Sequence, residues 1–330
     1  MSFVINVAIH ASQFPEKVRR DLLKSLRTRR VNHKFHYDSV KQTQKWLALH
    51  QAYSPTRNDA DCRAMYENGF KAAADQIKTK SVHVIGLGCG GGQKDTRLLK
   101  LLKMAGREIF YMPCDVSMAM VLTASRTALA VIPEKNCFPL VCDLATTDGL
   151  SDILVTRHPS LVTFFGMIPN FEPQIILPKL ASLVQPKDFL LFSANLAPGE
   201  NYAIGVKKVL TQYDNPLTRG WLMTFLLDLG VERDDGDLGF KIEDDPATDL
   251  KRIVAGFHFT RSRRIGVDHE TFYFRIGETI RLFFSYRYTP EHVRKVLARF
   301  GLEVCDQWIA KSEEEGVFLV RRSGVSEERR

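Results

Sequence analysis

A glycine-rich segment, Val84-Ile-Gly-Leu-Gly-Cys-Gly-Gly-Gly-Gln-Lys94, is the stretch of this sequence most suggestive of chemistry. Glycines that follow an apolar strand let the backbone approach a ligand closely, because a Cβ would clash and several positions can require positive φ. The G-x-G-x-G spacing alone is a weak signal, since dinucleotide-binding folds share it. It predicts a ligand site where a strand turns into a helix.

Two aspartates follow at the ends of the next two predicted strands. Asp115 ends the second strand, where a carboxylate can accept hydrogen bonds from both hydroxyls of a ribose. Asp143 ends the third strand, where methyltransferases often contact the adenine amino group. Open α/β sheets bind ligands at the carboxyl ends of their strands. The glycine turn and the two acids together predict a site for S-adenosylmethionine (SAM), without a metal. Either aspartate could instead be a helix cap or a loop acid.

The fourth predicted strand ends in Phe164-Phe-Gly-Met-Ile-Pro-Asn-Phe171, at the position that faces the transferable methyl group. Amino-methylating enzymes of nucleic acids often carry Asn/Asp-Pro-Pro-Tyr/Phe there. Here a single proline precedes Asn170, so that motif is not met. The segment therefore favours an acceptor other than RNA or DNA.

Strands that alternate with helices must position these residues. The predicted strands are Ser81–Leu87, Ile109–Met112, Phe138–Cys142, Leu161–Phe165 and Phe189–Ala194. The predicted helices are 59–79, Gln93–Ala105 and Met118–Ala130, after a mainly helical N-terminal stretch over 14–50 and a loop at Tyr53–Arg57. This alternation predicts a parallel sheet.

The pattern changes after Pro198. A mainly helical stretch over 199–230, an acidic glycine-containing loop (Glu232–Gly239) and strand-like stretches Arg252–Ser262 and His269–Tyr288 come next. A helix (Glu291–Phe300) and two strands (Glu303–Ala310, Val317–Arg321) close the chain. We therefore predict an α/β fold of the class I SAM-methyltransferase type, a Rossmann-like sheet with a terminal antiparallel hairpin. Residues 59–199 and 288–330 would form the core, and 1–58 and 200–287 a discontinuous accessory substrate-binding domain.

Several segments in the same order resemble motifs of the histidine-specific SAM-dependent methyltransferase family, whose founding activity is Nα-methylation of histidine in ergothioneine synthesis. The matching segments are Lys34-Phe-His-Tyr-Asp38, Tyr53-Ser-Pro-Thr-Arg57, Leu87–Lys94, Pro113-Cys-Asp-Val-Ser117, Gly166–Phe171, Gln212-Tyr-Asp-Asn215, Gly277-Glu278 and Ser285-Tyr-Arg287. The resemblance covers about residues 34 to 300, and the ordered set is specific although no single motif is.

The resemblance implies the following cofactor-binding residues. Gly88, Gly90 and Lys94 would line the methionine end of SAM, Asp115 would hold the ribose, and Asp143 with Leu144 the adenine.

It also implies residues for the acceptor. Tyr53 would lie near the reacting amine and the sulfonium, and Asn170 and Tyr213 would hold the head group of an amino-acid substrate. Tyr53 and Asn170 are thus the expected catalytic residues, and Ser285 would face the substrate's side chain. Transfer from SAM needs mainly alignment of a neutral amine, and free α-amines have a pKa near 7.7–8, so no strong general base is required.

The sequence departs from the family pattern at positions near the ligands. Gly91 and Gly92 stand where hydroxyl side chains are common, and Ser54 replaces a tyrosine. Phe283 stands where a glutamate would grip an imidazole, and in a strand it would share a face with Ser285. A phenyl ring cannot accept an imidazole N–H, so we expect an acceptor that is less polar than histidine.

Bulk properties limit the class of protein. The 330 residues are 45% apolar and 25% charged, which is ordinary for a soluble globular chain. No apolar run approaches the roughly 20 residues of a membrane span, and no signal peptide is visible at Met1. Six scattered cysteines form no CxxC pair, as expected for reduced thiols in the cytoplasm. We therefore predict a cytoplasmic enzyme with no membrane partner.

Two other functions stay open. The formal net charge of +8, concentrated in Arg19–Lys34 and Arg261–Arg264, is compatible with an RNA or protein methyltransferase. A degenerate SAM-binding protein without turnover is the second alternative. We favour a small amino-acid-like acceptor and do not expect nucleic acid as a partner; the oligomeric state does not follow from the sequence.

Overall fold

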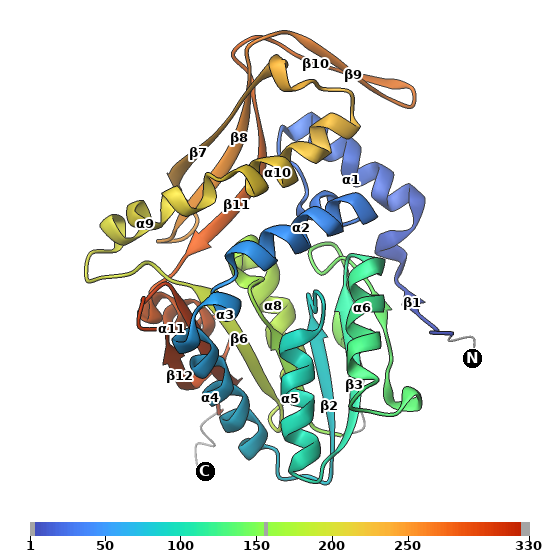
Figure 1. Cartoon of the computed structure of the whole chain (residues 1–330), viewed down its shortest axis with the longest axis vertical. Coiled ribbons are helices and arrows are strands. Elements are labelled where there is room, and N and C mark those ends of the chain that lie inside the picture. The colour runs from blue at the N-terminus through green and yellow to red at the C-terminus, as the bar shows by residue number, and fades with distance from the viewer. Residues whose placement is uncertain (1–3, 155–157, 325–330) are drawn as a thin grey trace, which may run out of the picture.

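Eight strands form a mixed sheet in the lower half of the molecule (Figure 1). The computed structural model describes residues 4–154 and 158–324. In spatial order the strands are β1 (Ala8–Ile9), β4 (Leu140–Val141), β3 (Glu108–Asp115), β2 (Ser81–Leu87), β5 (Ser160–Phe164), β6 (Phe189–Asn195), β13 (Glu315–Arg322) and β12 (Leu302–Ile309). The first six run parallel, and β13 lies antiparallel between β6 and β12. The predicted α/β sheet with a terminal antiparallel hairpin is confirmed.

Helices cover both faces of this sheet, and an apolar core lies on each face. One core contains residues of α4 (Ala60–Gln76), α5 (Gln93–Met104) and α6 (Met118–Ala128). The other contains residues of α7 (Leu150–Ile153), α8 (Pro173–Leu183) and α11 (Pro290–Ala298). The side chains of β2 alternate between them, because successive residues of a strand point to opposite faces. Val82 and Val84 belong to the first core, and Ile85 and Leu87 to the second.

The strand order creates a crevice at the carboxyl end of β2. From β2 the chain proceeds to β3 and β4 on one side, and then returns to β5 and β6 on the other side. The strand order therefore reverses between the neighbouring strands β2 and β5. In open α/β sheets this switch point is where ligands bind, outside the carboxyl ends of the strands.

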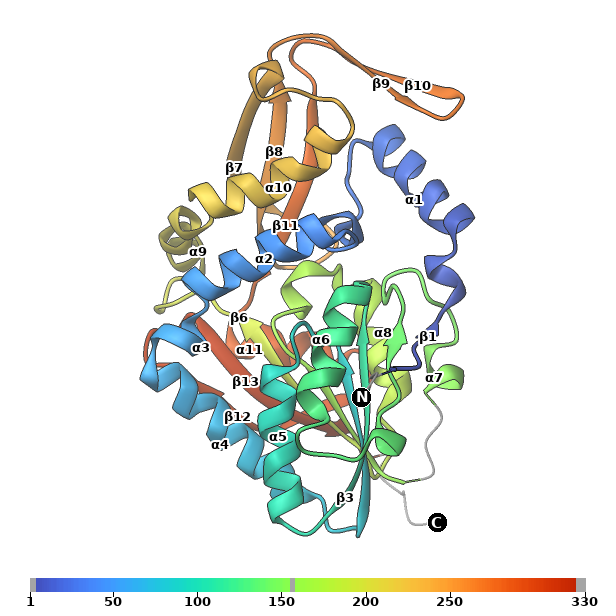
Figure 2. The ribbon, with the colours of Figure 1, turned by 45° about the vertical axis from the view of Figure 1, so that its right-hand side comes forward.

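A second sheet stands above the first (Figures 1 and 2). It contains β7 (Gly236–Asp244), β8 (Lys251–Phe259) and β11 (Thr279–Arg287), all antiparallel, and the hairpin β9 (Arg263–Val267) and β10 (Glu270–Phe274) extends from it. The helices beside it are α1 (Pro15–Thr28), α2 (Val40–Tyr53), α9 (Tyr202–Leu210) and α10 (Pro216–Asp228). A third apolar core joins the N-terminal segment to this part, with Leu26, Phe225 and Phe257 among its members.

The short strand β1 departs from the expected domain division. Its two residues pair in parallel with β4, so this part of the 1–58 segment extends the edge of the lower sheet. From β1 the chain continues through α1 to the upper sheet (Figure 2). The N-terminal segment therefore ties the two parts of the molecule together.

Several element boundaries differ from the sequence-based expectation. The stretch 14–50 is broken after α1, where Arg29 adopts φ 56°, and a 3-10 turn at His33–His36 precedes α2. The expected loop at Tyr53–Arg57 is the end of α2 and a short helix, α3 (Pro55–Asn58). The acidic loop becomes strand from Gly236 onward. The expected strand His269–Tyr288 is divided into β10 and β11 by a turn that contains Gly277, with φ 89°.

Helix α2 crosses above the carboxyl ends of the lower strands, between the two sheets (Figures 1 and 2). It contacts α10 above and α6 below. Its lower face therefore closes over the crevice at β2. Within the described ranges, no helix is both long and apolar enough to cross a membrane.

Candidate functional site

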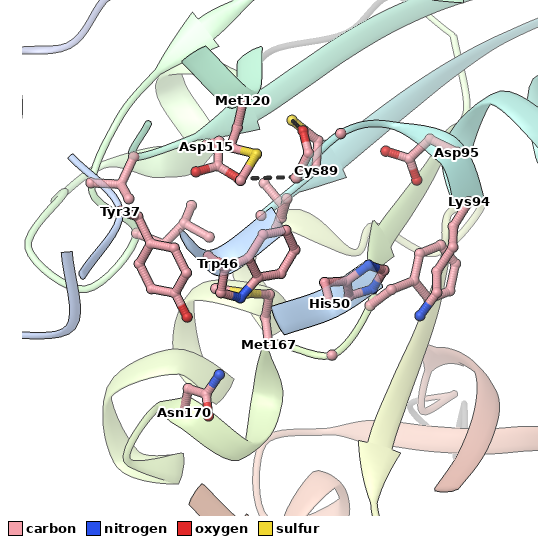
Figure 3. A pocket seen from close by; sticks show the side chains of 18 of the residues that line it. Tyr37, Trp46, His50, Cys89, Lys94, Asp95, Asp115, Met120, Met167 and Asn170 are labelled. Carbon is pink, nitrogen blue, oxygen red and sulfur yellow. Dashed lines mark hydrogen bonds between the residues drawn. The ribbon is translucent and has the colours of Figure 1, made fainter. Parts of the chain in front are cut away.

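A cavity of about 400 Å³ lies between α2 and the carboxyl ends of β2, β3, β4 and β5 (Figure 3). Its walls include seven of the residues that the sequence predicts for the site: Gly88, Gly90, Lys94, Asp115, Asp143, Leu144 and Asn170. The structure thus brings together residues from four successive strand ends. The volume is in the range of small-molecule sites.

The glycine turn needs its glycines for two physical reasons. Gly88 has φ 59°, and a Cβ there would lie 2.6 Å from the Cγ of Met167. Gly90 has φ 52°, and the nearest side-chain atom to its missing Cβ is Cη2 of Trp46, at 3.6 Å. Residues other than glycine rarely adopt this backbone conformation. Glycine at both positions therefore leaves the backbone of the turn exposed to the cavity.

Asp115 is buried at the end of β3 and braces the glycine turn. Its Oδ2 accepts a hydrogen bond from the Gly90 N–H at 3.0 Å, and its Oδ1 accepts one from the Ser117 N–H at 2.9 Å. Burial raises the pKa of this carboxyl above its ordinary value, while the backbone N–H groups oppose the shift. Asp115 also lines the cavity, so its carboxylate oxygens can accept further hydrogen bonds from the hydroxyls of a ligand.

Asp143 is held by its own turn and by a buried lysine. Its carboxylate accepts hydrogen bonds from the Ala145 N–H and the Thr146 hydroxyl, both at 2.9 Å. The Nζ of Lys34 lies 3.5 Å from Asp143 Oδ2 and 2.5 Å from Asp21 Oδ2. This buried triad links the N-terminal segment to the loop after β4. Leu144 is the buried apolar residue beside it, and it also lines the cavity.

One end of the cavity carries the ammonium group of Lys94. Lys94 Nζ lies 4.0 Å from the ring centroid of Tyr66 and donates a hydrogen bond to its hydroxyl at 2.7 Å. The pKa of His50 is lowered to about 4, first by burial and then by the charges of Lys94 and Arg57. A neutral His50 beside two cations suits an anionic ligand group such as a carboxylate.

The opposite side of the cavity carries Asn170, Tyr37 and His33 (Figure 3 shows the first two). Asn170 lies in the 3-10 turn Ile168–Asn170 that follows β5. Burial, with a smaller contribution from Asp115, raises the pKa of Tyr37, so its hydroxyl stays protonated. The pKa of His33 is lowered to about 3 by burial and by the nearby His36 and Arg281. These side chains are neutral hydrogen-bonding groups at physiological pH.

Tyr213, Phe283 and Ser285 form a separate cluster behind His33 and are not among the residues that line the cavity. The Tyr213 hydroxyl donates to Ser285 Oγ at 2.9 Å and accepts from Arg287 Nη2 at 2.8 Å. The ring of Phe283 lies 6.2 Å from that of Tyr213 and 5.1 Å from that of His33, centroid to centroid. The cluster brings three of the predicted acceptor residues together, outside the set that lines the cavity.

Tyr53 lies outside the cavity. It is the last residue of α2, the residue is 53% exposed, and it does not line the cavity. His50, nearly one helical turn earlier, does line the cavity. The helix continues past the cavity before it ends, and this carries Tyr53 to the surface.

The lining residues that the sequence reasoning missed include His33, Tyr37, Trp46 and His50. Trp46 and His50 are four residues apart, which puts them on one helix face, and their rings stack with centroids 5.0 Å apart. Tyr37 lies within the matching segment Lys34–Asp38. The helical spacing was therefore a usable signal, whereas nothing local marked His33.

The residues of the cavity fit SAM. The bare glycine turn, the carboxylate of Asp115 and the cations at the far end match a nucleoside, its ribose hydroxyls and an amino-acid carboxylate. Within the described part of the chain, no three His, Cys, Asp or Glu side chains are grouped as they would be around a metal ion.

Comparison with known protein families supports SAM as the cofactor. Residues 18–322 match the family described as histidine-specific methyltransferase, SAM-dependent. The N-methyltransferase fsqC of Aspergillus fumigatus is 23% identical over 243 residues, which are 71% of this chain and 64% of that protein, so the match spans less than two thirds of the relative's length.

Solved structures of methyltransferases are also similar to this chain. Magnesium protoporphyrin IX methyltransferase from Synechocystis PCC 6803, with bound SAH, has 14% identity and a TM-score of 0.46, covering 86% of this chain and 95% of that one. The glycopeptide N-methyltransferase MtfA, complexed with SAM, has 14% identity and a TM-score of 0.37, covering 78% and 94%. The assignment rests on the family match, which spans nearly the whole chain. The chain therefore belongs to the histidine-specific, SAM-dependent methyltransferase family.

Proposed function

We propose that this methyltransferase transfers the methyl group of SAM to the α-amine of an amino acid or a related small amine, and that histidine is not its acceptor. The cavity supports a small-molecule acceptor, because it lies beneath α2 and its volume of about 400 Å³ is in the range of small-molecule sites. The relative named an N-methyltransferase supports nitrogen as the methylated atom.

The carboxylates of the cavity carry the argument against histidine. Among the described residues, the acids that line the cavity are Asp95, Asp115 and Asp143, and we assign all three to the cofactor. The acceptor side retains Asn170, Tyr37 and His33, which are neutral. An imidazole N–H would pair there with a neutral acceptor instead of a carboxylate, and such a hydrogen bond is weaker by about 1 kcal/mol. A less polar side chain would avoid that cost.

The chemistry needs positioning more than acid–base catalysis. Bound SAM supplies an electrophilic methyl group on a positively charged sulfur. The chain's part is to hold a neutral amine in line, which can contribute several kcal/mol and up to roughly 7–11. In the proposed arrangement the Asn170 amide and the Tyr37 hydroxyl orient the acceptor's head group. The low pKa of His33 makes it a weak base, so the amine loses its proton to solvent before transfer.

The basic N-terminal helix gives little support to the RNA or protein alternative. Arg19 and Arg27 of α1 form ion pairs with Asp268 and Glu270 of the β9–β10 hairpin. Part of the positive charge is thus neutralised within the chain. The alternative of a SAM-binding protein without turnover is tested by the assay below.

We also propose a cytoplasmic location. All six cysteines are free, and the sulfurs of Cys114 and Cys142 lie 3.1 Å apart as two thiols. Unpaired thiols in such proximity are typical of a reducing compartment.

A direct assay tests the proposed function. The protein is incubated with isotope-labelled SAM and each amino acid in turn, and products are identified by mass. We expect a singly or multiply N-methylated amino acid from the aromatic or aliphatic group, with histidine turned over at least tenfold less efficiently. A clear preference for histidine would overturn the exclusion of histidine. Methylation of RNA or protein alone, or binding of SAM without any product, would overturn the proposal as a whole.

A further inference from the structure

A third carboxylate of the cavity, Asp95, has a setting unlike those of Asp115 and Asp143. It lies in the first turn of α5, beside Lys94, and is 3% exposed. The Tyr111 hydroxyl donates to its Oδ2 and the Thr163 hydroxyl to its Oδ1, both at 2.7 Å. The side chain also lines the cavity. Helix α5 therefore places a buried carboxylate beside the glycine turn.

A glycine in strand β2, Gly86, leaves room for this carboxylate. Gly86 pairs with Pro113 of β3 and Thr163 of β5, in the middle of the sheet. A Cβ on Gly86 would collide with Oδ2 of Asp95. Glycine inside a strand often marks a close approach by another group. Gly86 and Asp95 are thus complementary, and the sheet is built around this carboxylate.

Asp95 has hydroxyl partners but no cationic one. Within the described ranges, no nitrogen of lysine, arginine or histidine lies within 4.0 Å of its oxygens. Its two hydrogen bonds fill about two of its four lone-pair positions. Burial raises its pKa above the ordinary value, and the Lys94 charge and the two hydroxyls oppose the shift only in part. A buried carboxylate without a counterion is costly, so the site favours a cationic ligand group.

The place of Asp95 in the cavity identifies that group. Figure 3 shows Asp95 and Lys94 at one end and Asp115 at the other. Since Asp115 fits the ribose, the Lys94 end accommodates the methionine part of SAM, which carries one α-carboxylate and one α-ammonium group. We infer that Asp95 binds the α-ammonium group of SAM, while Lys94 binds the α-carboxylate. Two adjacent residues of opposite charge thus recognise the two charges of the cofactor's amino acid.

This inference concerns the cofactor and holds for any acceptor. A purely structural role would be to tie α5 to β3 and β5 through Tyr111 and Thr163. The two roles differ in one measurable respect. Recognition of the ammonium group makes the effect of Asp95 depend on whether the ligand has an amine, whereas a structural role affects all ligands equally.

Calorimetric binding of three ligands separates the two roles. The ligands are S-adenosylhomocysteine, its desamino analogue, which lacks the ammonium group, and its decarboxylated analogue, which keeps it. We expect the wild type to bind S-adenosylhomocysteine about tenfold to a hundredfold more tightly than the desamino analogue, the range for a hydrogen bond to a charged group. Asp95→Asn should remove this preference and leave the affinity for the desamino analogue within about threefold.

Two control variants complete the experiment. Thr163→Val removes a hydroxyl partner of Asp95 but keeps the carboxylate, so the preference should remain. Lys94→Met should lower the affinity for S-adenosylhomocysteine but not the affinity for its decarboxylated analogue. If Asp95→Asn does not fold, Asp95→Ala combined with Gly86→Asp moves the carboxylate to β2 and should keep a preference above about fivefold. Equal wild-type affinity for the amino and desamino ligands, an equal loss for both in Asp95→Asn, or no preference in the combined variant would overturn the inference.

Discussion

The imidazole ring of His33 lies against the phenyl ring of Phe283, with centroids 5.1 Å apart, and it is the His33 ring that lines the cavity. Phe283 is 7% exposed and also packs against Trp221, at 5.8 Å between centroids. A substitution at Phe283 therefore reaches the acceptor only through His33. The two residues form successive layers of one wall.

This layering predicts how acceptor choice can be changed. Phe283→Glu alone should give no histidine turnover and should lower the melting temperature, because the new carboxylate is buried behind His33. Combining it with His33→Ala removes the ring that separates residue 283 from the cavity. The double variant should have a kcat/KM for histidine at least tenfold above that of either single variant. Steady-state kinetics with histidine and phenylalanine measures this. Phe283→Leu is the matched control and should leave acceptor preference unchanged.

Histidine turnover by Phe283→Glu alone would show instead that Phe283 reaches the acceptor directly. That result would also remove His33 from the wall that discriminates between acceptors.

A second prediction concerns Asp115. Asp115→Ala should weaken SAM binding by about 1.5–3 kcal/mol, the range for a hydrogen bond to a charged group. The loss has two sources, the bonds to the ribose and the support of Gly90. Asp188 is a matched control, since it is also buried and accepts two backbone N–H groups, those of Ser160 and Gln185.

Asp188→Ala should lower stability and leave the dissociation constant for SAM within about twofold, as measured by calorimetry below the melting temperature. An unchanged affinity in Asp115→Ala would remove Asp115 from the site.

The sequence predicted the cofactor half of the cavity better than the acceptor half. Gly88, Asp115 and Asp143 follow directly from strand ends, because the carboxyl ends of neighbouring parallel strands meet at one edge of the sheet. Their positions depend on local signals and on one topological rule. The class of sheet and its terminal hairpin follow from the same strand and helix pattern.

The acceptor half depends on how distant segments pack. His33 and Trp46 reach the cavity because α2 crosses above the lower sheet, and no local pattern indicates where that helix lies. Tyr53 illustrates the same limit, since its motif is recognisable but the length of α2 places it at the surface. Asp95 was not predicted, because an acidic residue in the first turn of a helix is common and gives no signal of a ligand site.

A third prediction concerns Asn170. In the described part of the chain its side-chain amide makes no hydrogen bond, and only its backbone N–H is engaged, with the Met167 carbonyl at 2.9 Å. A free amide in the cavity wall is available for the acceptor. Asn170→Ala should therefore lower kcat/KM for the acceptor about tenfold to a hundredfold while the dissociation constant for SAM stays within a few-fold.

Asn170→Asp is the matched control for shape. It should be more impaired than Asn170→Ala, because its charge repels the carboxylate of an amino-acid acceptor. Kinetics and calorimetry on the same preparations give both constants. A collapse of SAM affinity with intact acceptor kinetics would place Asn170 on the cofactor side.

The last prediction concerns pH. His33 and His50, with pKa values lowered to about 3 and about 4 chiefly by burial, gain charge only in acid, and burial keeps the Tyr37 hydroxyl protonated by raising its pKa. None of these groups changes charge between about pH 6 and 9. The acceptor's α-amine begins to lose its proton in this range, since the α-amine of a peptide has a pKa of about 7.7–8 and the carboxylate of a free amino acid raises it further; only the neutral amine has a lone pair for the methyl group.

We therefore expect kcat/KM for the acceptor, at saturating SAM, to rise about tenfold per pH unit below the amine's pKa and to level off above it. The inflection should move with the acceptor when two amino acids of different amine pKa are compared. His33→Gln should keep the inflection in place, because a neutral amide replaces an already neutral imidazole. An inflection that stays fixed when the acceptor is changed, and disappears in His33→Gln, would instead make His33 a general base, and its buried, low-pKa ring would have to gain a proton during turnover.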